Sequence, residues 1–581
     1  MKIICFSSHT AIWDFAFAEA TMASELQKKG HEVLFVTPGN QFTGISNLKQ
    51  EKILRGEFDL KGYQIGSKLG KNDYKQITSI LKKQNKKNFD KLVMNNINIG
   101  KLALYEFLLN HKKSNVDLTQ EEWKECVICI KNTLISFFAC RAIIKKEKPD
   151  RILMYNTLYS VNHVWERYAK SRSIPVYFLH HGLNISDMGN TLIIAKLNSL
   201  NYFKKLINIW SKLKNVPVSE EMLQYVTDNF LELLKAKHYL VYSSPKSNKH
   251  VSTREFFNVK ENQKILTATM SSVDELFSAK YVGARDLPKN LIFTNQTDWI
   301  NQLINYVKER QDLFLIIRVH PREFPNKRES VKSGYAKILE SLFENLPDNV
   351  KVNWPTDNIS MYDLAQETDV FLNAWSSVGV EMSLLGIPVV VYSKELILYP
   401  ADLNYLAKDS EDYFIKIDMA LNDGWSYQRM KKTYRWLVLY YYRTILRFRS
   451  ENAEFNKFTA ISLVFGMLNY IYNLLPSKIK VVLTKILVIP KLNMDRRYRE
   501  DCSRQRAEHV DISSVENMLK KSEETLVNIK EAFASKISET KEDLYIRNEV
   551  KRIYKTLYGN SLKGTKINKN SLQYNLRKTF V

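Results

Sequence analysis

Residues that break regular structure are scarce in this chain. Glycine and proline account for only 18 and 14 of its 581 residues, which argues against long disordered linkers between folded parts. The chain has only five cysteines, and these do not form the disulfide framework of a small secreted domain. No internal repeat is visible. The low content of glycine, proline and cysteine favours folded domains that are stabilised by ordinary hydrophobic cores.

The length and charge of the chain narrow its class further. A chain of 581 residues is too long for one core and predicts two or three domains. Lys and Arg number 86 against 62 Asp and Glu, a net charge of +24, which suits an anionic partner such as nucleic acid, a membrane surface or a phosphate-rich substrate. The basic residues are scattered rather than gathered around a motif that reads bases, so no nucleic acid partner is expected.

Two of the cysteines, Cys126 and Cys129, form a CxxC pair within a segment of helical character. A zinc site needs four ligands and a second pair is missing, so we expect two half-buried core cysteines rather than a metal site. The N-terminal segment MKIICFSSHT has too short an apolar run for a signal peptide. We therefore expect a cytoplasmic protein.

Short apolar runs alternate with helical segments over residues 1–250. KIICF predicts a first strand, AEATMASELQKKG a helix that ends at Gly30, and HEVLFVT a second strand. Continuous apolar runs are typical of parallel sheets that are covered on both faces. Residues from about 50 to 147 are mostly helical and basic, which indicates an insertion. The strands RILMYNT and IPVYFLHHG then resume the series.

A second series begins near residue 262. Its expected strands are KILTATM, LFLIIRVH, VKVNW, VFLNA and PVVVY, with helices such as TDWINQLINYVKERQ and SVGVEMSLLG between them. The sequence therefore predicts an α/β protein with two Rossmann-like doubly wound domains, at 1–250 and 251–424. In open sheets of this kind, ligands bind at the carboxyl ends of the strands.

The remaining region, 425–581, differs in character and predicts a helical extension. WSYQRMKKTYRWLVLYYYRTILRFRS mixes aromatic residues with cations, and residues 458–475 contain no charge. Eighteen residues are the lower limit for a membrane span, and Asn469 and Asn473 count against one. We therefore favour an interfacial helix with basic flanks over 458–489, ahead of a helix packed on the domains and of a true span.

The first chemical motif is LIIRVHPRE, which ends in His320 and Pro321 followed by charge. His320 follows a predicted central strand, so its imidazole is expected in the crevice between the domains. Pro321 ends the hydrogen bonding of that strand and helps to fix the direction of the imidazole. An imidazole there can donate to a phosphate oxygen or protonate a departing phosphate. The alternative is a surface histidine at a strand end.

The second motif is LNAWSSVGVEMSLLG. Ser376 and Ser377 follow a strand and begin a helix, where one of them is a plausible N-cap. Two hydroxyls, backbone N–H groups and the helix dipole together make an anion site. Glu381 lies one turn later on the same face, where it can accept hydrogen bonds from ribose hydroxyls. A Ser-Ser cap alone is commonly structural, but its pairing with His320 favours function.

Three further residues accompany these motifs. The stretch TATMSS ends the first strand of the second domain, and Thr269 and Ser271 within it are small enough to approach a diphosphate or nucleotide closely. Arg318 precedes His320 by two residues and can help it to stabilise a departing phosphate. Alternatively, Arg318 points into a salt bridge.

These motifs resemble those of a known group of enzymes. Residues 310–395 are similar to the donor-binding half of GT-B glycosyltransferases, and above all to bacterial capsule and lipopolysaccharide synthesis proteins such as Kdo and sialic acid transferases. In that group a His-Pro and a Ser-Ser motif hold the cytidine monophosphate of the donor, which implies this role for His320-Pro321 and Ser376-Ser377. DLAQETDVFLNAWSSVGVE also resembles CDP-glycerol glycerophosphotransferases.

If the enzyme inverts configuration, the resemblance also implies a catalytic base in the first domain. A carboxylate or a neutral histidine can act as such a base. The candidates are Asp14 and Glu19 near the first loop, His181 at a later strand end, and beside these His9, His180 and Asp187. A retaining enzyme needs no such base. No DxD motif stands in a suitable loop and GT-B enzymes commonly need none, so neither metal nor cofactor is expected.

The sequence thus predicts a metal-independent glycosyltransferase that uses a nucleotide-sugar donor, with a CMP-sugar favoured. The expected acceptor is lipid-linked or a surface polysaccharide of capsule or lipopolysaccharide synthesis, reached from the cytoplasmic face of the inner membrane. The alternatives are a CDP-glycerol-type glycerophosphotransferase, a sugar-nucleotide epimerase and a non-catalytic polysaccharide assembly or export protein. Nucleotide binding separates the last of these from the rest.

Overall fold

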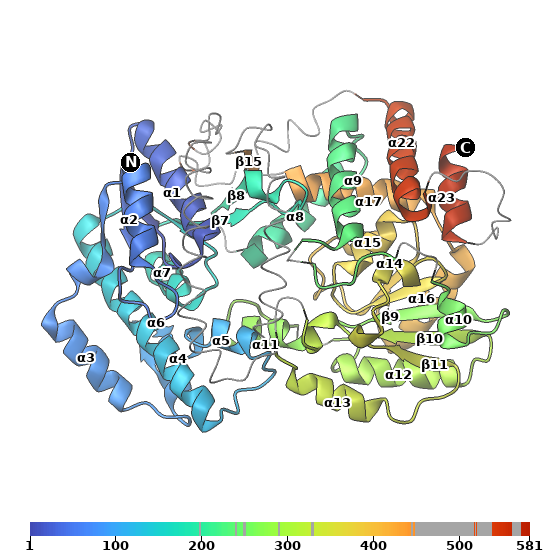
Figure 1. The fold of residues 1–581 in the computed structure, drawn as a ribbon, viewed down its shortest axis with the longest axis horizontal. Coiled ribbons are helices and arrows are strands. Elements are labelled where there is room, and N and C mark those ends of the chain that lie inside the picture. Colours follow the sequence, from blue (N-terminus) through green and yellow to red (C-terminus); the bar gives the residue numbers. More distant parts are fainter. Residues whose placement is uncertain are drawn as a thin grey trace, which may run out of the picture.

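Two lobes, each built around its own sheet, lie side by side in the computed structural model (Figure 1). The structure describes residues 1–196, 199–238, 241–247, 251–288, 291–326, 330–442, 445–447, 516, 519, 537–559 and 571–581.

The first sheet is mainly parallel and has the strand order β15-β8-β7-β6-β1-β2-β3. β8 and β15 are the antiparallel members, and all other neighbours are parallel. The strands are β1 (Lys2–Phe6), β2 (Glu32–Thr37), β3 (Gly62–Gln64), β6 (Arg151–Tyr155), β7 (Val176–His181), β8 (Thr191–Ala195) and β15 (Ile445–Arg447).

Helices cover both faces of this sheet. Ile4 and Phe6 of β1 pack into a core shared with α6 and α7, whereas Ile3 and Cys5 of the same strand pack into a core shared with α1. Successive side chains of a strand point to opposite faces, so a strand that is apolar throughout requires cover on both. The helices are α1 (Trp13–Lys28), α2 (Leu48–Glu57), α3 (Lys71–Lys82), α4 (Ile99–Leu102), α5 (Tyr105–Asn110), α6 (Gln120–Glu147) and α7 (Ser160–Lys170).

The second sheet is parallel throughout, in the order β11-β10-β9-β12-β13-β14. Counted from β9, this is the order 3-2-1-4-5-6 of a doubly wound Rossmann sheet. Its strands are β9 (Lys264–Thr269), β10 (Leu313–Arg318), β11 (Val350–Asn353), β12 (Val370–Asn373), β13 (Val389–Val391) and β14 (Tyr405–Leu406). The predicted α/β class with two Rossmann-like domains is confirmed.

The helices of the second lobe complete its cover. They are α10 (Thr253–Phe257), α11 (Val273–Tyr281), α12 (Gln296–Lys308), α13 (Gly334–Leu342), α14 (Met361–Leu364), α15 (Val378–Leu384) and α16 (Ser410–Asp423). Between the sheets the chain forms α8 (Ser199–Leu213) and α9 (Glu220–Lys235), and α17 (Tyr427–Tyr442), α22 (Glu539–Tyr558) and α23 (Leu572–Phe580) follow the second sheet.

Two segments that the sequence assigns to an insertion and to an extension contribute strands to the first sheet. The predicted insertion at about 50–147 includes β3, which is the edge strand of the first sheet. The predicted extension at 425–581 includes β15, which pairs with β8 at the other edge. A two- or three-residue strand carries too little periodicity to be recognised from its sequence, so the limits themselves stay a prediction.

The aromatic helix α17 is largely buried. Tyr434, Trp436, Val438 and Leu439 have at most 1% of their surface exposed and join a core with α9, α15 and α22. These aromatic side chains therefore pack inside the protein rather than facing a bilayer. The apolar stretch 458–489, for which we predicted an interfacial helix, lies outside the described residues.

Helix α6 has the length and hydropathy of a membrane span, but 67% of its most apolar window is buried inside the protein. Cys126 in this helix is buried and Cys129 partly so. The helix is thus part of the core of the first lobe, and the predicted placement of both cysteines is confirmed.

Candidate active site

The chain order of the second sheet reverses between β9 and β12. At such a switch point the loops diverge to opposite faces and leave a crevice beyond the carboxyl ends of the strands. A cavity of about 190 Å³ lies there, and we call it the polar cavity. Among its lining residues are Thr269, Arg318, His320, Pro321, Ser376, Ser377 and Glu381. All the predicted donor-binding residues except Ser271 thus meet at one place.

His320 stands two residues beyond the end of β10, and its side chain is partly exposed. Its Nδ1 accepts a hydrogen bond from the backbone N–H of Arg322 at 3.2 Å. In a neutral imidazole the nitrogen that accepts is unprotonated, so the proton belongs to Nε2. The ring of Tyr242, which also lines the polar cavity, lies 6.0 Å from that of His320. The imidazole is therefore held in the tautomer that donates through Nε2.

Arg318 is buried, and its guanidinium is directed toward the neighbouring strand. Its Nη1 donates to the side-chain oxygen of Asn353 and, at 2.9 Å, to the carbonyl of Ile359. Burial lowers the pKa of Arg318 to about 10. These partners hold β10 and β11 together, and the predicted part of Arg318 in stabilising phosphate stays a prediction.

Thr269 and Ser271 also have structural partners. The Thr269 hydroxyl donates to Asn373 Oδ1 at 2.9 Å. The Ser271 hydroxyl accepts from the backbone N–H of Trp375 at 3.1 Å, and Ser271 does not line the polar cavity. The Thr269 hydroxyl joins the end of β9 to the end of β12, and the Ser271 hydroxyl joins the loops that follow these strands, so both help to fix the place of the Ser-Ser motif.

The two serines have different tasks at the start of α15. Ser376 Oγ accepts from the backbone N–H of Val378 at 3.2 Å, whereas Ser377 occupies the N-cap position and makes no side-chain cap hydrogen bond. Ser377 is exposed and donates to Glu381 Oε1 at 2.7 Å. A hydroxyl has a single proton, so Ser377 orients Glu381 while Ser376 supports the start of the seven-residue helix α15.

The carboxyl group of Glu381 lies between two hydroxyl groups that donate hydrogen bonds to it. Ser377 donates to one of its oxygens, and Tyr362 OH donates to the other at 2.8 Å. Burial raises the pKa of Glu381 above its usual value. The carboxyl group is thus oriented rigidly, with lone pairs left to accept from ligand hydroxyls.

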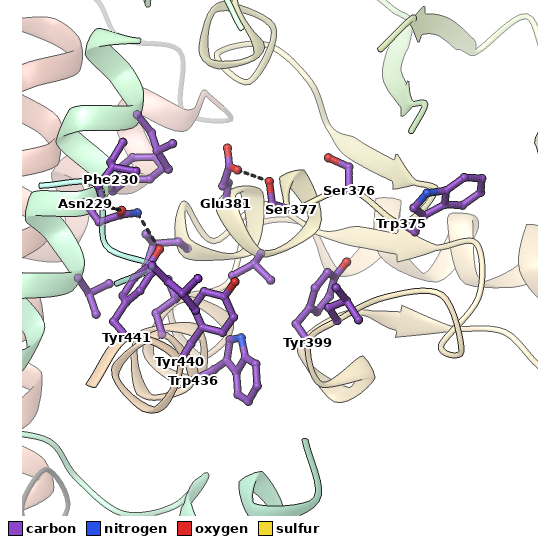
Figure 2. A pocket seen from close by; sticks show the side chains of 18 residues that line it. Asn229, Phe230, Trp375, Ser376, Ser377, Glu381, Tyr399, Trp436, Tyr440 and Tyr441 are labelled. Carbon is purple, nitrogen blue, oxygen red and sulfur yellow. Dashed lines mark hydrogen bonds between the residues drawn. The ribbon is translucent and has the colours of Figure 1, made fainter. Parts of the chain in front are cut away.

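A second cavity of about 290 Å³ adjoins the first, and we call it the aromatic cavity. The two share Ile185, Leu233, Ser376, Ser377 and Glu381 as a common wall. Figure 2 shows the aromatic cavity, with side chains that come from α9, α15 and α17. The sequence does not predict this cavity, because its wall gathers residues from segments that are some two hundred positions apart.

In the first lobe, three of the candidate bases gather around Tyr155 at the end of β6. Its backbone N–H donates to Glu19 Oε1 at 2.7 Å. Its ring lies 5.4 Å from that of His180 and 5.5 Å from that of His181. Burial raises the pKa of Glu19 to about 8 and lowers that of His180.

None of these candidates lines either cavity. Glu19 is only 1% exposed, whereas His181 is partly exposed and lies just before Leu183 and Ile185, which do line the cavities. Position therefore favours His181 among the predicted bases. Asp14 is exposed in the first turn of α1.

His9 and Asp187 have partners within the first lobe. His9 is buried, its Nδ1 lies 2.7 Å from Ser8 Oγ, and its Nε2 lies 3.7 Å from Glu106. Asp187 accepts from Asn190 at 3.0 Å and from Tyr225 at 3.3 Å. These contacts account for the polar side chains of both residues without a catalytic role.

The loop that carries His320 is tied to the first lobe. Arg322 forms a buried ion pair with Asp274 at 3.0 Å and donates to the carbonyl of Leu109 at 2.8 Å. Lys112 donates to the carbonyls of Phe324 and Val331 at 3.2 and 2.6 Å. The position of His320 therefore depends on how the two lobes meet.

No protein-family model matches this chain, and no curated protein does. Three solved structures illustrate what it is similar to. A UDP-GlcNAc 2-epimerase from Neisseria meningitidis is 13% identical, with 74% of this chain and 94% of that chain covered and a TM-score of 0.25. A UDP-GlcNAc 2-epimerase from Methanocaldococcus jannaschii is 15% identical, with 75% and 98% covered and a TM-score of 0.27.

The third structure is KpsC of Thermosulfurimonas dismutans, described as a β-Kdo 2,4 transferase. It is 15% identical, with 52% of this chain and 83% of that chain covered and a TM-score of 0.32. The low TM-scores mean that the chains superpose poorly over their whole lengths. The fold class of this protein therefore follows from the strand order of its own two sheets.

Proposed function

We propose that this protein is a metal-independent glycosyltransferase of the GT-B type that uses a nucleotide-activated sugar. One observation carries the proposal: His320 follows β10, the Ser-Ser motif and Glu381 follow β12, and all of them line one cavity at the switch point of the second sheet. Donors of hydrogen bonds and an acceptor for hydroxyls together suit the phosphate and ribose of a nucleotide.

The proposed chemistry rests on charge at the departing phosphate. A bond forms between the acceptor oxygen and the anomeric carbon, the bond between the anomeric carbon and the phosphate oxygen breaks, and negative charge develops on that phosphate oxygen. His320 Nε2–H and the Ser376 hydroxyl donate hydrogen bonds to it, which is favourable in a preorganised site, while Ser377 keeps its proton on Glu381. The acceptor hydroxyl approaches from the first lobe, where His181 is the base that we favour if the reaction inverts configuration.

We further propose a lipid-linked or polysaccharide acceptor at the cytoplasmic face of the membrane. The support comes from sequence: the uncharged stretch 458–475 and its lysine-rich flanks match an interfacial segment. Vesicle flotation tests this part separately. Binding to vesicles with anionic lipid, lost when the lysines of 478–491 are neutralised, would support it, and full-length protein that stays unbound would refute it.

A thermal-shift screen against CMP, CDP, UDP and GDP tests nucleotide binding. A ligand at one hundred times its Kd stabilises the folded state by about 2.7 kcal/mol. We expect one nucleotide to raise the Tm of the wild type and to lose this effect in His320→Ala. His111→Ala is the matched control, because His111 is paired with Glu125 at 2.8 Å and lines neither cavity.

The outcomes distinguish the alternatives. A folded protein whose Tm no nucleotide shifts would favour a non-catalytic assembly role. A protein that binds nucleotide sugars and changes their sugar configuration without any acceptor, as seen by NMR, would be an epimerase. Transfer of a glycerol phosphate from CDP-glycerol would instead indicate a glycerophosphotransferase.

A further inference from the structure

The aromatic cavity has a chemistry unlike that of the polar cavity beside it. Its wall contains six aromatic residues together with aliphatic side chains of α9, α15 and α17. The aromatic residues are Phe230, Trp375, Tyr399, Trp436, Tyr440 and Tyr441. Figure 2 shows that these side chains come from both sides of the α15 start. Walls of this kind suit a ring whose faces are apolar.

Polar groups are confined to a few places on this wall. Asn229 donates to Tyr441 OH at 2.7 Å and accepts from the backbone N–H of Ile185 at 2.9 Å. Tyr399 OH accepts from Asn373 at 3.0 Å. Glu381, Ser376 and Ser377 lie at the wall shared with the polar cavity. A ligand that fits must therefore have apolar faces and hydroxyls at its edge, which describes a sugar ring.

The charges of the wall narrow the choice of sugar. Among the described lining residues, none is Lys, Arg or His, and the ionisable carboxyl is Glu381. A carboxylate of a ligand that entered such an apolar space would lose its hydration without gaining a cationic partner. It would also lie close to the like charge of Glu381 when that residue is ionised.

We propose that the aromatic cavity holds the glycosyl group of the donor and selects an uncharged sugar. This inference rests on the proposed function, because it places the sugar beside the phosphate site that the polar cavity provides. It departs from the expectation based on sequence resemblance, since Kdo and sialic acid both carry a carboxylate. The donor sugar is thus a neutral one, rather than an acidic sugar such as Kdo or sialic acid.

Matched donors test the inference by isothermal titration calorimetry. UDP-glucose and UDP-glucuronate differ only in a carboxylate, as do UDP-galactose and UDP-galacturonate. We expect a neutral member to bind about tenfold or more tightly than its acidic partner, which corresponds to about 1.4 kcal/mol. CMP-sialic acid is expected to bind no more tightly than CMP.

A charge placed in the wall provides the matching variant. Tyr440 is partly exposed in the cavity, so Tyr440→Arg can add a cation while its charged end still reaches water. We expect this variant to reduce or reverse the preference in affinity for the neutral UDP-sugar over its acidic partner. The affinity for UDP alone should stay unchanged. Tyr440→Leu is the control, because it removes the ring without adding charge.

Each result has a defined meaning. An acidic donor that binds as tightly as its neutral partner, or a sugar that adds no affinity to the nucleotide alone, would overturn the inference while the proposed function stands. If folded protein binds no nucleotide of any kind, both fail together. Should Tyr440→Arg not fold, the wild-type ratios alone decide.

Discussion

At the scale of single residues, the orientation of His320 follows from one backbone contact. Because Arg322 N–H donates to Nδ1, the imidazole presents Nε2–H as its donor whenever it is neutral. Pro321 follows directly and supplies no N–H that could compete for the ring. The ring nitrogen of His320 that a phosphate would meet is thus determined by Pro321 and Arg322.

We expect His320→Ala to lower kcat/KM of glycosyl transfer by about 10²-fold or more, the usual contribution of a positioned proton donor. Initial-rate kinetics with the donor identified by the nucleotide screen would measure this. The control His111→Ala should retain wild-type kinetics. A His320→Ala variant with unchanged kcat/KM would remove this histidine from the mechanism.

Arg318 is a cation at the same site, but its hydrogen-bond partners, Asn353 and Ile359, belong to the protein itself. We expect Arg318→Met to lower the free energy of unfolding by about 1–3 kcal/mol, because Asn353 Oδ1 and the Ile359 carbonyl lose their donor. Nucleotide affinity per folded molecule should change little. Urea unfolding measures the loss of stability, and calorimetry measures the nucleotide affinity.

Lys124→Met is the surface control for that experiment, since Lys124 pairs with Glu121 in an exposed setting and its loss should cost little stability. Loss of nucleotide affinity without loss of stability would make Arg318 a donor-binding residue after all. Sequence alone could not decide this, because Arg318 ends the strand that leads to His320, and only the position of Asn353 shows where the guanidinium points.

At the scale of elements, the start of α15 depends on a glycine. A Cβ on Gly379 would lie 2.0 Å from the Tyr399 hydroxyl and 2.8 Å from Asn373 Nδ2. Tyr399 is only 5% exposed and hydrogen-bonded to Asn373, so it cannot move aside easily. The glycine therefore lets α15 approach the loop that supplies Tyr399 to the aromatic cavity.

We expect Gly379→Ala to cost about 1–3 kcal/mol of stability, as overpacking of a core usually does. The double variant Gly379→Ala with Tyr399→Phe should recover part of this loss, because it removes the clashing hydroxyl. Gly56→Ala is the control, since nothing lies within 4 Å of its Cβ and alanine favours a helix. Additive effects of the two substitutions would contradict the close approach.

The elements that could be predicted from sequence are those with long apolar runs. The β9, β10 and β12 segments are four to six residues long and nearly all buried, so their ends located Thr269, His320 and the Ser-Ser motif correctly beside one another. Strands β3, β14 and β15 have two or three residues and carry no such signal. The aromatic cavity escaped prediction because α9 and α17 meet only in the folded chain.

At the scale of the whole molecule, buried carboxyl groups make stability depend on pH. Glu19 has its pKa raised by burial to about 8, well above that of an exposed glutamate. Between about pH 4.5 and 8 the folded state binds this proton while the unfolded state releases it. The contribution of Glu19 is therefore fully present below the lower value and is lost as the pH rises to the upper one.

We expect Glu19→Gln to flatten the fall in unfolding free energy between pH 5.5 and 8, since an amide keeps the acceptor for Tyr155 N–H but does not ionise. Urea unfolding of both proteins at the two pH values measures the difference. Glu32→Gln, at an exposed position, should leave the slope unchanged. An unaltered slope in Glu19→Gln would mean that this carboxyl group is not the one that titrates.

The contact between the lobes couples the two halves of the proposed reaction. Lys112, in the first lobe, donates to two carbonyls of the segment that follows His320, yet it lines neither cavity.

We expect Lys112→Met to leave nucleotide Kd within about twofold while kcat falls by up to about 10²-fold, because a displacement near 1 Å between reacting groups has that effect. Lys113→Met is the matched control, since the neighbouring lysine pairs with Glu122 inside its own lobe. Calorimetry gives Kd, and initial rates at saturating donor give kcat. If Kd and kcat change in parallel, the contact acts through the donor site itself; if neither changes, the lobes are held in register by other contacts, and the tie between Lys112 and the His320 loop has no part in the reaction.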